Sequence, residues 1–347
     1  MFKIKNRIIS EKHKPFIIAE LSGNHNGFLE NALKLVDIAS KCGVDAVKLQ
    51  TFKANTITIK SSRKEFFIND KKNIWKNQSL FDLYNKAHTP WEWHKKIFDR
   101  AKKRKIMIFS SPFDESAVDF LEKLNVPAYK VASFEINHFP LLKKIAKTKK
   151  PVILSTGLAT FLDIKNAINI LKKNGCDKIA ILKCTSSYPA NQKDLNLKTI
   201  VEMRKKFKCE VGFSDHSIGN SAALTAIGMG ATIIEKHLTL KKKFGIDGKF
   251  SSEYEEMKNL KKDSINAWLS KGIVLFGPTK NEKRYVKYRR SIYTSKNIKK
   301  GEKFTKYNIK VVRPALGMHP KFFDIIIGKI SKKKMLSGTP IKKTYIK

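Results

Sequence analysis

Short apolar runs recur along the chain about every 25 to 35 residues, and each is followed by a stretch with the period of an amphipathic helix. The runs are rich in β-branched residues, which are typical of strands. Eight such runs can be counted, at residues 16–22, 46–52, 106–112, 128–133, 151–156, 179–185, 210–217 and 232–239. Strands that alternate with helices in this way predict an α/β fold whose parallel sheet closes into a (β/α)8 TIM barrel.

Each predicted strand begins with apolar residues and ends in polar ones. The polar ends are Glu20, Gln50, Ser110 and Ser111, Ser133, Ser155 and Thr156, Thr185, Ser214 to His216, and Glu235 to His237. A strand buried on both faces should be apolar throughout, whereas barrel enzymes carry their chemistry at the C-terminal strand ends. The pattern therefore favours a barrel over a doubly wound open sheet, which would gather ligands at one switch point.

Two regions depart from this repeat. Residues 53–88 exceed an ordinary βα loop and include an amphipathic helix pattern, so we expect them to help cover the barrel mouth. Near the C-terminus the chain has short strands, Gly-containing turns and almost no long helical period, which predicts a small β-rich domain. The expected divisions are a barrel domain at 1–280, a linker at 281–288 and the β-rich domain at 289–347.

Composition indicates a soluble cytoplasmic protein. Hydrophobic residues make up 41% of the 347 residues, and no apolar run approaches the roughly 20 residues that span a bilayer. The first residues carry scattered basic side chains and no apolar stretch before a cleavage site, so no export signal is expected. Four dispersed cysteines without a CxxC pair fit a reducing compartment.

The formal net charge of +41 changes this picture little. Such an excess could indicate a polyanion partner such as nucleic acid or anionic lipid. The lysines, however, are spread over nearly every predicted helix, without aromatic interleaving or a concentrated basic tail. We therefore predict solvated helix faces, with neither nucleic acid nor a membrane as partner, and some attraction of anionic substrates.

Two histidines lie at the ends of neighbouring predicted strands, His216 on the seventh and His237 on the eighth. A single histidine in such a place is more often a core or rim residue than a ligand. Paired imidazoles can share a divalent metal and leave open coordination positions for a substrate oxygen. The pair therefore predicts a metal site with a Lewis-acid role.

Lys48 and Lys130 lie within the second and fourth predicted strands, where burying an ammonium group is costly unless an anion compensates it. Phosphate or carboxylate would compensate it, with help from hydroxyls at Ser110, Ser111, Ser133, Ser155, Thr156 and Ser214. Glu20 is a candidate for handling a proton, with an ion pair to Lys48 as the alternative. These residues indicate a metal-assisted enzyme for an anionic substrate, and leave condensation, aldol cleavage and hydrolysis open.

Longer motifs carry a more specific resemblance. They are IIAELSGNHNG, DAVKLQTF, TPWEWH, FSSPFDESAVDFLE, YKVASFE, ILSTGL, KCTSSYPA, GFSDHSIGNSAALTA and IIEKHLTL. Together they resemble the sialic acid synthase family over nearly the whole chain. The C-terminal segments RRSIYTSKNIKKGE and VVRPALGM resemble the antifreeze-like (SAF, β-clip) domain that follows the barrel in these synthases. Within the family, AELSGNHN, TPWEWH and KCTSSYPA look most like the pseudaminic acid synthase branch.

The resemblance implies a role for each matching residue. It implies that His216 and His237 bind a manganese or magnesium ion that polarises the aldehyde of an N-acetylated amino sugar. The positions implied to hold phosphoenolpyruvate are Lys48, Ser111, Lys130, Ser133, Ser155, Ser186 and Ser214. Those implied to face the sugar are Glu20, Asn77, Tyr188, Glu235 and Asp247. Arg313 would enter the partner's active site, which implies a domain-swapped homodimer.

The implied reaction joins phosphoenolpyruvate to the sugar aldehyde with C–O cleavage and loss of phosphate, in a bacterial glycoconjugate pathway such as flagellin glycosylation. Ser186 replaces the Asn of CTNxYP, and GIDGKFS replaces a GPDH-type loop around Asp247, so a legionaminic or N-acetylneuraminate synthase stays an alternative. A class II-type aldolase or deoxy-sugar-phosphate synthase would lack the C-terminal domain. A non-catalytic protein that binds nucleic acid, ice or glycan would not need the metal and anion ligands.

Overall fold

The computed structural model describes residues 1–69 and 75–347. The chain divides into two compact units, Met1–Gly272 and Ile273–Lys347. Helix α10 (Tyr254–Lys271) ends directly before the division.

Eight parallel strands of the first unit form a closed barrel, in the order β10-β3-β4-β5-β6-β7-β8-β9. Their bounds are β3 Phe16–Glu20, β4 Ala46–Thr51, β5 Met107–Pro112, β6 Tyr129–Val131, β7 Val152–Ser155, β8 Ile179–Cys184, β9 Glu210–Asp215 and β10 Ile233–His237. Each lies within one of the eight predicted runs. The closed ring confirms the TIM barrel and excludes the doubly wound sheet.

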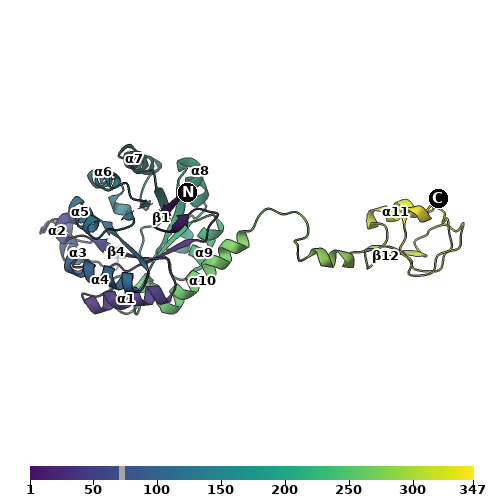
Figure 1. The fold of residues 1–347 in the computed structure, drawn as a ribbon, viewed down its shortest axis with the longest axis horizontal. Helices are drawn as coiled ribbons and strands as arrows, with labels where there is room; N and C mark the ends of the chain where they lie inside the picture. Colours follow the sequence, from purple (N-terminus) through teal and green to yellow (C-terminus); the bar gives the residue numbers. More distant parts are fainter. Residues whose placement is uncertain (70–74) are drawn as a thin grey trace. The chain divides into compact units, whose positions relative to one another are not determined.

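Helices surround the barrel strands (Figure 1). Besides α10 they are α1 Leu29–Lys41, α4 Trp91–Lys103, α5 Glu115–Lys123, α6 Phe139–Lys147, α7 Phe161–Lys173, α8 Thr199–Phe207 and α9 Ser221–Gly228. Their ends follow local chemistry: the Asp114 side chain accepts hydrogen bonds from the first amides of α5, and Thr160 and Asp163 form a capping box at α7. Within the described ranges, no helix combines the length and apolarity that crossing a membrane requires.

The long segment after β4 carries two further helices, α2 (Ala54–Ile57) and α3 (Leu80–Ala87). The second of these confirms the amphipathic helix expected there. An N-terminal hairpin of β1 (Phe2–Ile4) and β2 (Arg7–Ile9) was not expected, because strands of three residues carry too little periodicity to detect. Its Ile4 and Ile9 are fully buried and join the hydrophobic core of the barrel unit.

The second unit is small and built from short β elements, as its turns and short apolar runs predict. Strands β11 (Ser291–Thr294) and β12 (Ile309–Val312) pair antiparallel, and α11 (Phe323–Ile326) is a single turn. Its own core consists of Ile292, Ile298, Phe304, Ile309, Ile326, Met335 and Ile341. The unit therefore has a hydrophobic core separate from that of the barrel.

Gly212 on β9 lies where the neighbouring strands leave no room for a side chain. A Cβ atom there would lie 2.4 Å from the Ile233 carbonyl oxygen and 2.6 Å from a Leu182 methyl carbon. We expect Gly212→Ala to lower the free energy of unfolding by about 1–3 kcal/mol, the usual cost of overpacking. Chemical denaturation measures this. The control is Gly228→Ala, where nothing lies within 4 Å of the added Cβ, and an equal loss in both variants would contradict the prediction.

Candidate active site

A cavity of ≈ 410 Å³ opens at the C-terminal ends of the barrel strands. This volume lies in the range of small-molecule sites. Most of the predicted site residues line it: Glu20, Lys48, Lys130, Ser133, Ser155, Ser186, Tyr188, Ser214, His216, Glu235, His237 and Asp247. The structure thus brings together side chains that come from seven of the eight strands or the loops after them. Their roles in binding remain predictions.

Three predicted site residues lie elsewhere. Ser111 is fully buried behind the cavity, where its hydroxyl accepts a hydrogen bond of 3.2 Å from Lys48. Asn77 adopts a positive φ of 65° in the segment between β4 and α4, outside the residues that line the cavity. Arg313 is exposed on the second unit, after β12, and precedes a cis proline.

Besides Ser111, two further hydroxyls expected to donate to an anion do not line the cavity. Successive side chains of a strand point to opposite faces, so Ser110 faces away where Ser111 faces inward. The Ser110 hydroxyl bonds the Thr51 hydroxyl at 2.6 Å. Thr156 likewise donates to the Leu182 carbonyl oxygen at 2.9 Å. The expectation that Ser110 and Thr156 contribute hydrogen bonds to the ligand is therefore wrong.

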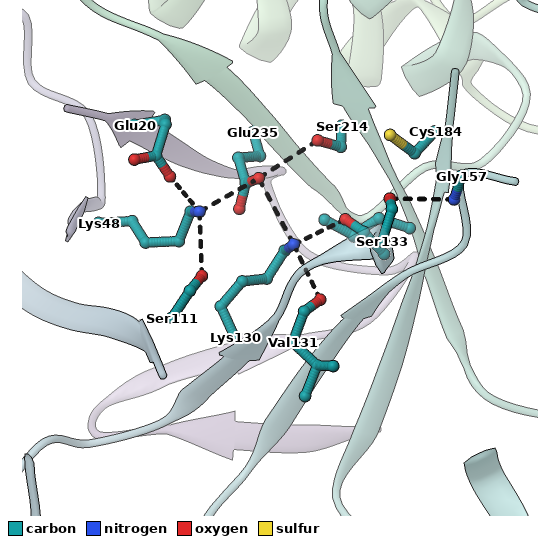
Figure 2. A network of polar contacts seen from close by, with 12 residues as sticks. Glu20, Lys48, Ser111, Lys130, Val131, Ser133, Gly157, Cys184, Ser214 and Glu235 are labelled. Carbon is teal, nitrogen blue, oxygen red and sulfur yellow. Dashed lines mark hydrogen bonds and ion pairs between the residues drawn. The ribbon is translucent and has the colours of Figure 1, made fainter. Parts of the chain in front are cut away.

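The polar centre of the cavity is a network of two lysines and two glutamates (Figure 2). Lys48 forms an ion pair with Glu20, its register partner on β3, and lies 3.6 Å from a carboxylate oxygen of Glu235. Lys130 lies 3.7 Å from the same Glu235 oxygen and donates to the Ser155 hydroxyl at 2.7 Å. All four are nearly fully buried, and Glu235 on β10 bridges the two ammonium groups.

Burial and neighbouring charge set the protonation of this network. Burial raises the pKa of Glu20, and the Lys48 ammonium opposes it. Burial would lower the pKa of Lys48, but Glu20 and Glu235 raise it above its ordinary value. For Glu235, burial is outweighed by Lys130 and Lys48, which lower its pKa. Burial lowers the pKa of Lys130, which has the weaker counter-charge. A second anion would therefore be most favourable beside Lys130.

The two predicted histidines face each other across the ends of β9 and β10, with ring centroids 5.4 Å apart. His216 Nδ1 lies 3.1 Å from the Thr185 carbonyl oxygen, so a proton on Nδ1 leaves Nε2 with a lone pair. Burial lowers the pKa of His237 well below its ordinary value, which keeps that ring neutral. For His216, burial is outweighed by Cys184, which raises the pKa of the ring, so metal binding there would displace a proton. Neutral imidazole is the form that binds metal ions.

The donor set fits a divalent ion through these two rings. His237 Nδ1 is buried without a hydrogen-bond partner among the described residues, and an Asp247 carboxylate oxygen lies 3.5 Å away. Across residues 1–69 and 75–347, no group of three or more His, Cys, Asp or Glu is arranged to hold a metal. An ion on His216 and His237 would therefore take its other ligands from water or substrate, as a site with open positions requires.

Cys184 lies behind His216, with its sulfur 3.9 Å from Nδ1. Burial alone would raise the pKa of this thiol, but His216, Ser133 and Lys130 lower it to about 7. From the sequence, Cys184 is only one of four dispersed cysteines. Its position at the end of a predicted strand could have indicated a site residue. All four cysteines are free.

A single asparagine fixes the loop that carries Asp247. The Asn24 amide nitrogen donates to the Leu238 carbonyl oxygen and the Ser251 hydroxyl, each at 2.9 Å, and its oxygen accepts from the Asp247 amide at 3.1 Å. Phe250 of the same loop packs against His237, with ring centroids 5.0 Å apart. Asn24 belongs to the NHNG motif, whose function the motif itself does not reveal.

Glu135 is a cavity residue that reasoning from the sequence missed, although it follows the end of a predicted strand. Its Oε2 atom is buried and has no hydrogen-bond partner in the described part of the chain. Burial raises the pKa of its carboxyl to about 7, with Lys130 and Lys48 opposing. The group therefore changes charge near neutral pH.

The closed barrel and the cavity of buried ammonium, carboxylate and imidazole groups at its strand ends define a TIM-barrel enzyme site. A model of the NeuB family matches residues 35–274, and a model of the SAF domain matches residues 289–346. The chain belongs to the NeuB family of synthases and carries a SAF domain after the barrel, which confirms the resemblance to the sialic acid synthases.

Individual members of the family are similar in sequence to this chain over most of its length. A pseudaminic acid synthase of Campylobacter jejuni is 43% identical, with 95% of this chain and 96% of the relative covered. An N,N'-diacetyllegionaminic acid synthase of the same species is 39% identical over 92% and 96%. The solved N-acetylneuraminic acid synthetase of Leptospira borgpetersenii, in complex with citrate, is 30% identical with a TM-score of 0.73, and 82% and 94% of the two chains are covered.

The Asn24 contacts predict a loop that opens when they are removed. We expect Asn24→Ala to speed hydrogen exchange at the Asp247 amide and to lower the free energy of loop opening by about 1–3 kcal/mol, because buried polar groups lose their partner. Hydrogen exchange followed by mass spectrometry over residues 239–252 measures this. Asn220→Ala, which removes an amide donor to the Glu256 carbonyl oxygen, is the control. Equal exchange in the two variants would refute the role of Asn24.

The raised pKa of Glu135 predicts a pH-dependent stability. A carboxyl whose pKa is higher in the folded state stabilises that state at low pH, and the contribution is lost as the pH rises through about 7. From about pH 5 to about pH 8, the free energy of unfolding of the wild type should therefore fall relative to that of Glu135→Gln. Urea denaturation at both pH values tests this, and parallel curves would show that Glu135 titrates normally.

Proposed function

We propose that the chain is a pseudaminic acid synthase, which condenses phosphoenolpyruvate with 2,4-diacetamido-2,4,6-trideoxy-altrose and water to give pseudaminic acid and phosphate. One observation carries the proposal: two buried ammonium groups, Lys48 and Lys130, share a cavity with the imidazoles of His216 and His237. Phosphoenolpyruvate has two anionic groups that suit the lysines. The sugar has an aldehyde whose carbonyl oxygen could bind a Lewis-acidic metal ion held by the two imidazoles.

The phosphoenolpyruvate end would be held by charge and by hydroxyl donors. Lys130 is the better anion ligand, because its nearest carboxylate oxygen is 3.7 Å away whereas Lys48 is already paired with Glu20. The hydroxyls of Ser133, Ser155, Ser186 and Ser214 line the same cavity and can donate to carboxylate or phosphate oxygens. Ser111 would act through Lys48, whose ammonium it contacts.

In the proposed reaction, C3 of phosphoenolpyruvate attacks the aldehyde carbon, whose oxygen takes up a proton and becomes a hydroxyl. Water adds at C2 and gives up its protons, and phosphate leaves as the C2–O bond breaks and C2 becomes a ketone. Glu20 is the group to accept the proton of the water, because burial raises its pKa towards that of a useful base. Lys48 and Lys130 stabilise the charge on the departing phosphate. A manganese or magnesium ion bound by His216 and His237 would polarise the aldehyde carbonyl.

The sugar side would be formed by Tyr188, Glu235 and Asp247, with Asn77 and Arg313 as further contacts. Arg313 belongs to the SAF domain, and we propose that it enters the site of a partner subunit in a domain-swapped homodimer. We further propose that the enzyme works in the cytoplasm and supplies a bacterial glycoconjugate such as glycosylated flagellin. Neither nucleic acid nor a membrane is needed for this function.

A legionaminic or N-acetylneuraminate synthase is the second candidate. The observation that favours it is the 39% identity with the diacetyllegionaminic acid synthase, only slightly below the 43% with the pseudaminic acid synthase. Both candidates use the same anion and imidazole groups, so they differ only in the sugar.

The deciding experiment offers the full-length protein manganese, phosphoenolpyruvate and one of three sugars: the diacetamido altrose, its legionaminic counterpart or N-acetylmannosamine. Phosphate release and product mass are followed. We expect metal-dependent product with the altrose, and a loss of roughly 100-fold or more in His216→Ala, because stabilisation of developing charge is removed. A different preferred sugar would transfer the proposal to the other branch. Absence of product with every sugar would refute the condensation itself.

A further inference from the structure

The cavity has two chemically different sides. The strand ends contribute lysine, glutamate, serine and histidine, whereas the segment between β4 and α4 contributes apolar side chains. These form an apolar wall of Ile57, Ile68, Leu80, Leu83, Tyr84 and Ala87. This segment therefore supplies a mostly apolar part of the lining. The strand ends and the loops after them supply the charged groups and imidazoles, together with Phe113, Ala132, Phe134 and Ile246.

The apolar wall has surface left to bury. Apart from Leu83, its members are only half-buried although they line a cavity. Ring contacts hold the wall against the barrel: Phe52, just after β4, lies 6.0 Å from Tyr84 and 5.0 Å from Phe113 between ring centroids. Partly exposed apolar side chains on a fixed support are the usual lining of a site for an apolar group of a ligand.

The same cavity also contains a polar group, the carboxyl of Glu135. The buried Oε2 atom of Glu135 has no hydrogen-bond partner among the described residues, and Glu135 lines the same cavity as the apolar wall. A buried acceptor without a partner is costly unless a ligand supplies the donor. The wall and Glu135 together suit a group with one N–H donor and an adjacent methyl.

We propose that the apolar wall and Glu135 form a subsite for the acylamino group at C4 of the sugar, an inference that rests on the proposed function. The amide N–H would donate to Glu135 and the acetyl methyl would pack on the wall. The acylamino group at C2 is bonded to the carbon next to the reacting aldehyde, so it must stay near the imidazoles and lysines. The C4 group lies two carbons further along and can reach the wall.

This subsite selects against a hydroxyl at C4. A hydroxyl fills less of the wall and brings a polar atom against Ile57 and Leu80, where few partners are available. N-acetylmannosamine carries such a hydroxyl, so the wall is expected to make it a poor substrate. The segment between β4 and α4 would thus determine specificity, while the strand ends carry out the reaction.

Two isoleucines of the same segment provide a matched test. Ile57 lines the cavity, whereas Ile59 is 64% exposed and does not. Values of kcat/KM for the diacetamido altrose and for its analogue with a hydroxyl in place of the C4 acetamido group would be measured with the wild type, Ile57→Asn and Ile59→Asn, all full-length with manganese. We expect Ile57→Asn to lower the ratio of the two values by about tenfold or more, since hydrophobic pocket contacts discriminate by such factors. Ile59→Asn should leave the ratio unchanged.

Titration calorimetry with phosphoenolpyruvate checks that each variant keeps its anion site, and the milder Ile57→Ala replaces Ile57→Asn if the latter does not fold. An unchanged ratio in the Ile57 variant, or equal changes in both variants, would overturn the subsite while leaving the synthase proposal intact. If the wild type makes no product from any sugar, the proposed function itself fails.

Discussion

Two ammonium groups buried inside a barrel are the constraint on which the rest of the site depends. Removing a charge from water costs several kcal/mol even after relaxation, so Lys48 and Lys130 can persist only beside carboxylates. Glu20 and Glu235 meet this need from the strand ends of β3 and β10. Because β3 pairs with both β4 and β10, the register of three adjacent strands is tied to one electrostatic requirement.

The same network leaves an asymmetry that suits catalysis. Lys48 has two carboxylates close to it, whereas Lys130, among the described residues, pairs with the more distant Glu235. An incoming anion therefore gains most beside Lys130, next to the Ser155 hydroxyl that already contacts its ammonium group. His216 and His237 lie at the ends of β9 and β10, the two strands that also carry Ser214 and Glu235. A ligand group bound by the imidazoles and a ligand group bound by the lysines therefore occupy the same cavity.

The barrel could be predicted because its strands are buried on both faces and their polar ends interrupt an otherwise apolar pattern. The same rule found the lysines, the histidines and most serines of the site. It could not decide which of Ser110 and Ser111 faces inward, since both follow the same apolar run and only the strand pleat separates them. Asn24 and Glu135 escaped for another reason: their importance lies in contacts or missing contacts that arise only when distant loops meet.

The chain position of Glu235 bears on how the protein is made. Synthesis delivers Lys48 and Lys130 long before β10, the last strand of the ring, and chains begin to fold from the N-terminus during synthesis. A seven-stranded intermediate would have to keep Lys130 hydrated, because its nearest carboxylate is still absent. Docking of β10 then closes the ring and neutralises the lumen in one step. A partial chain that ends before β10 therefore lacks the carboxylate that pairs with Lys130, and the loop that carries Asp247 follows later still.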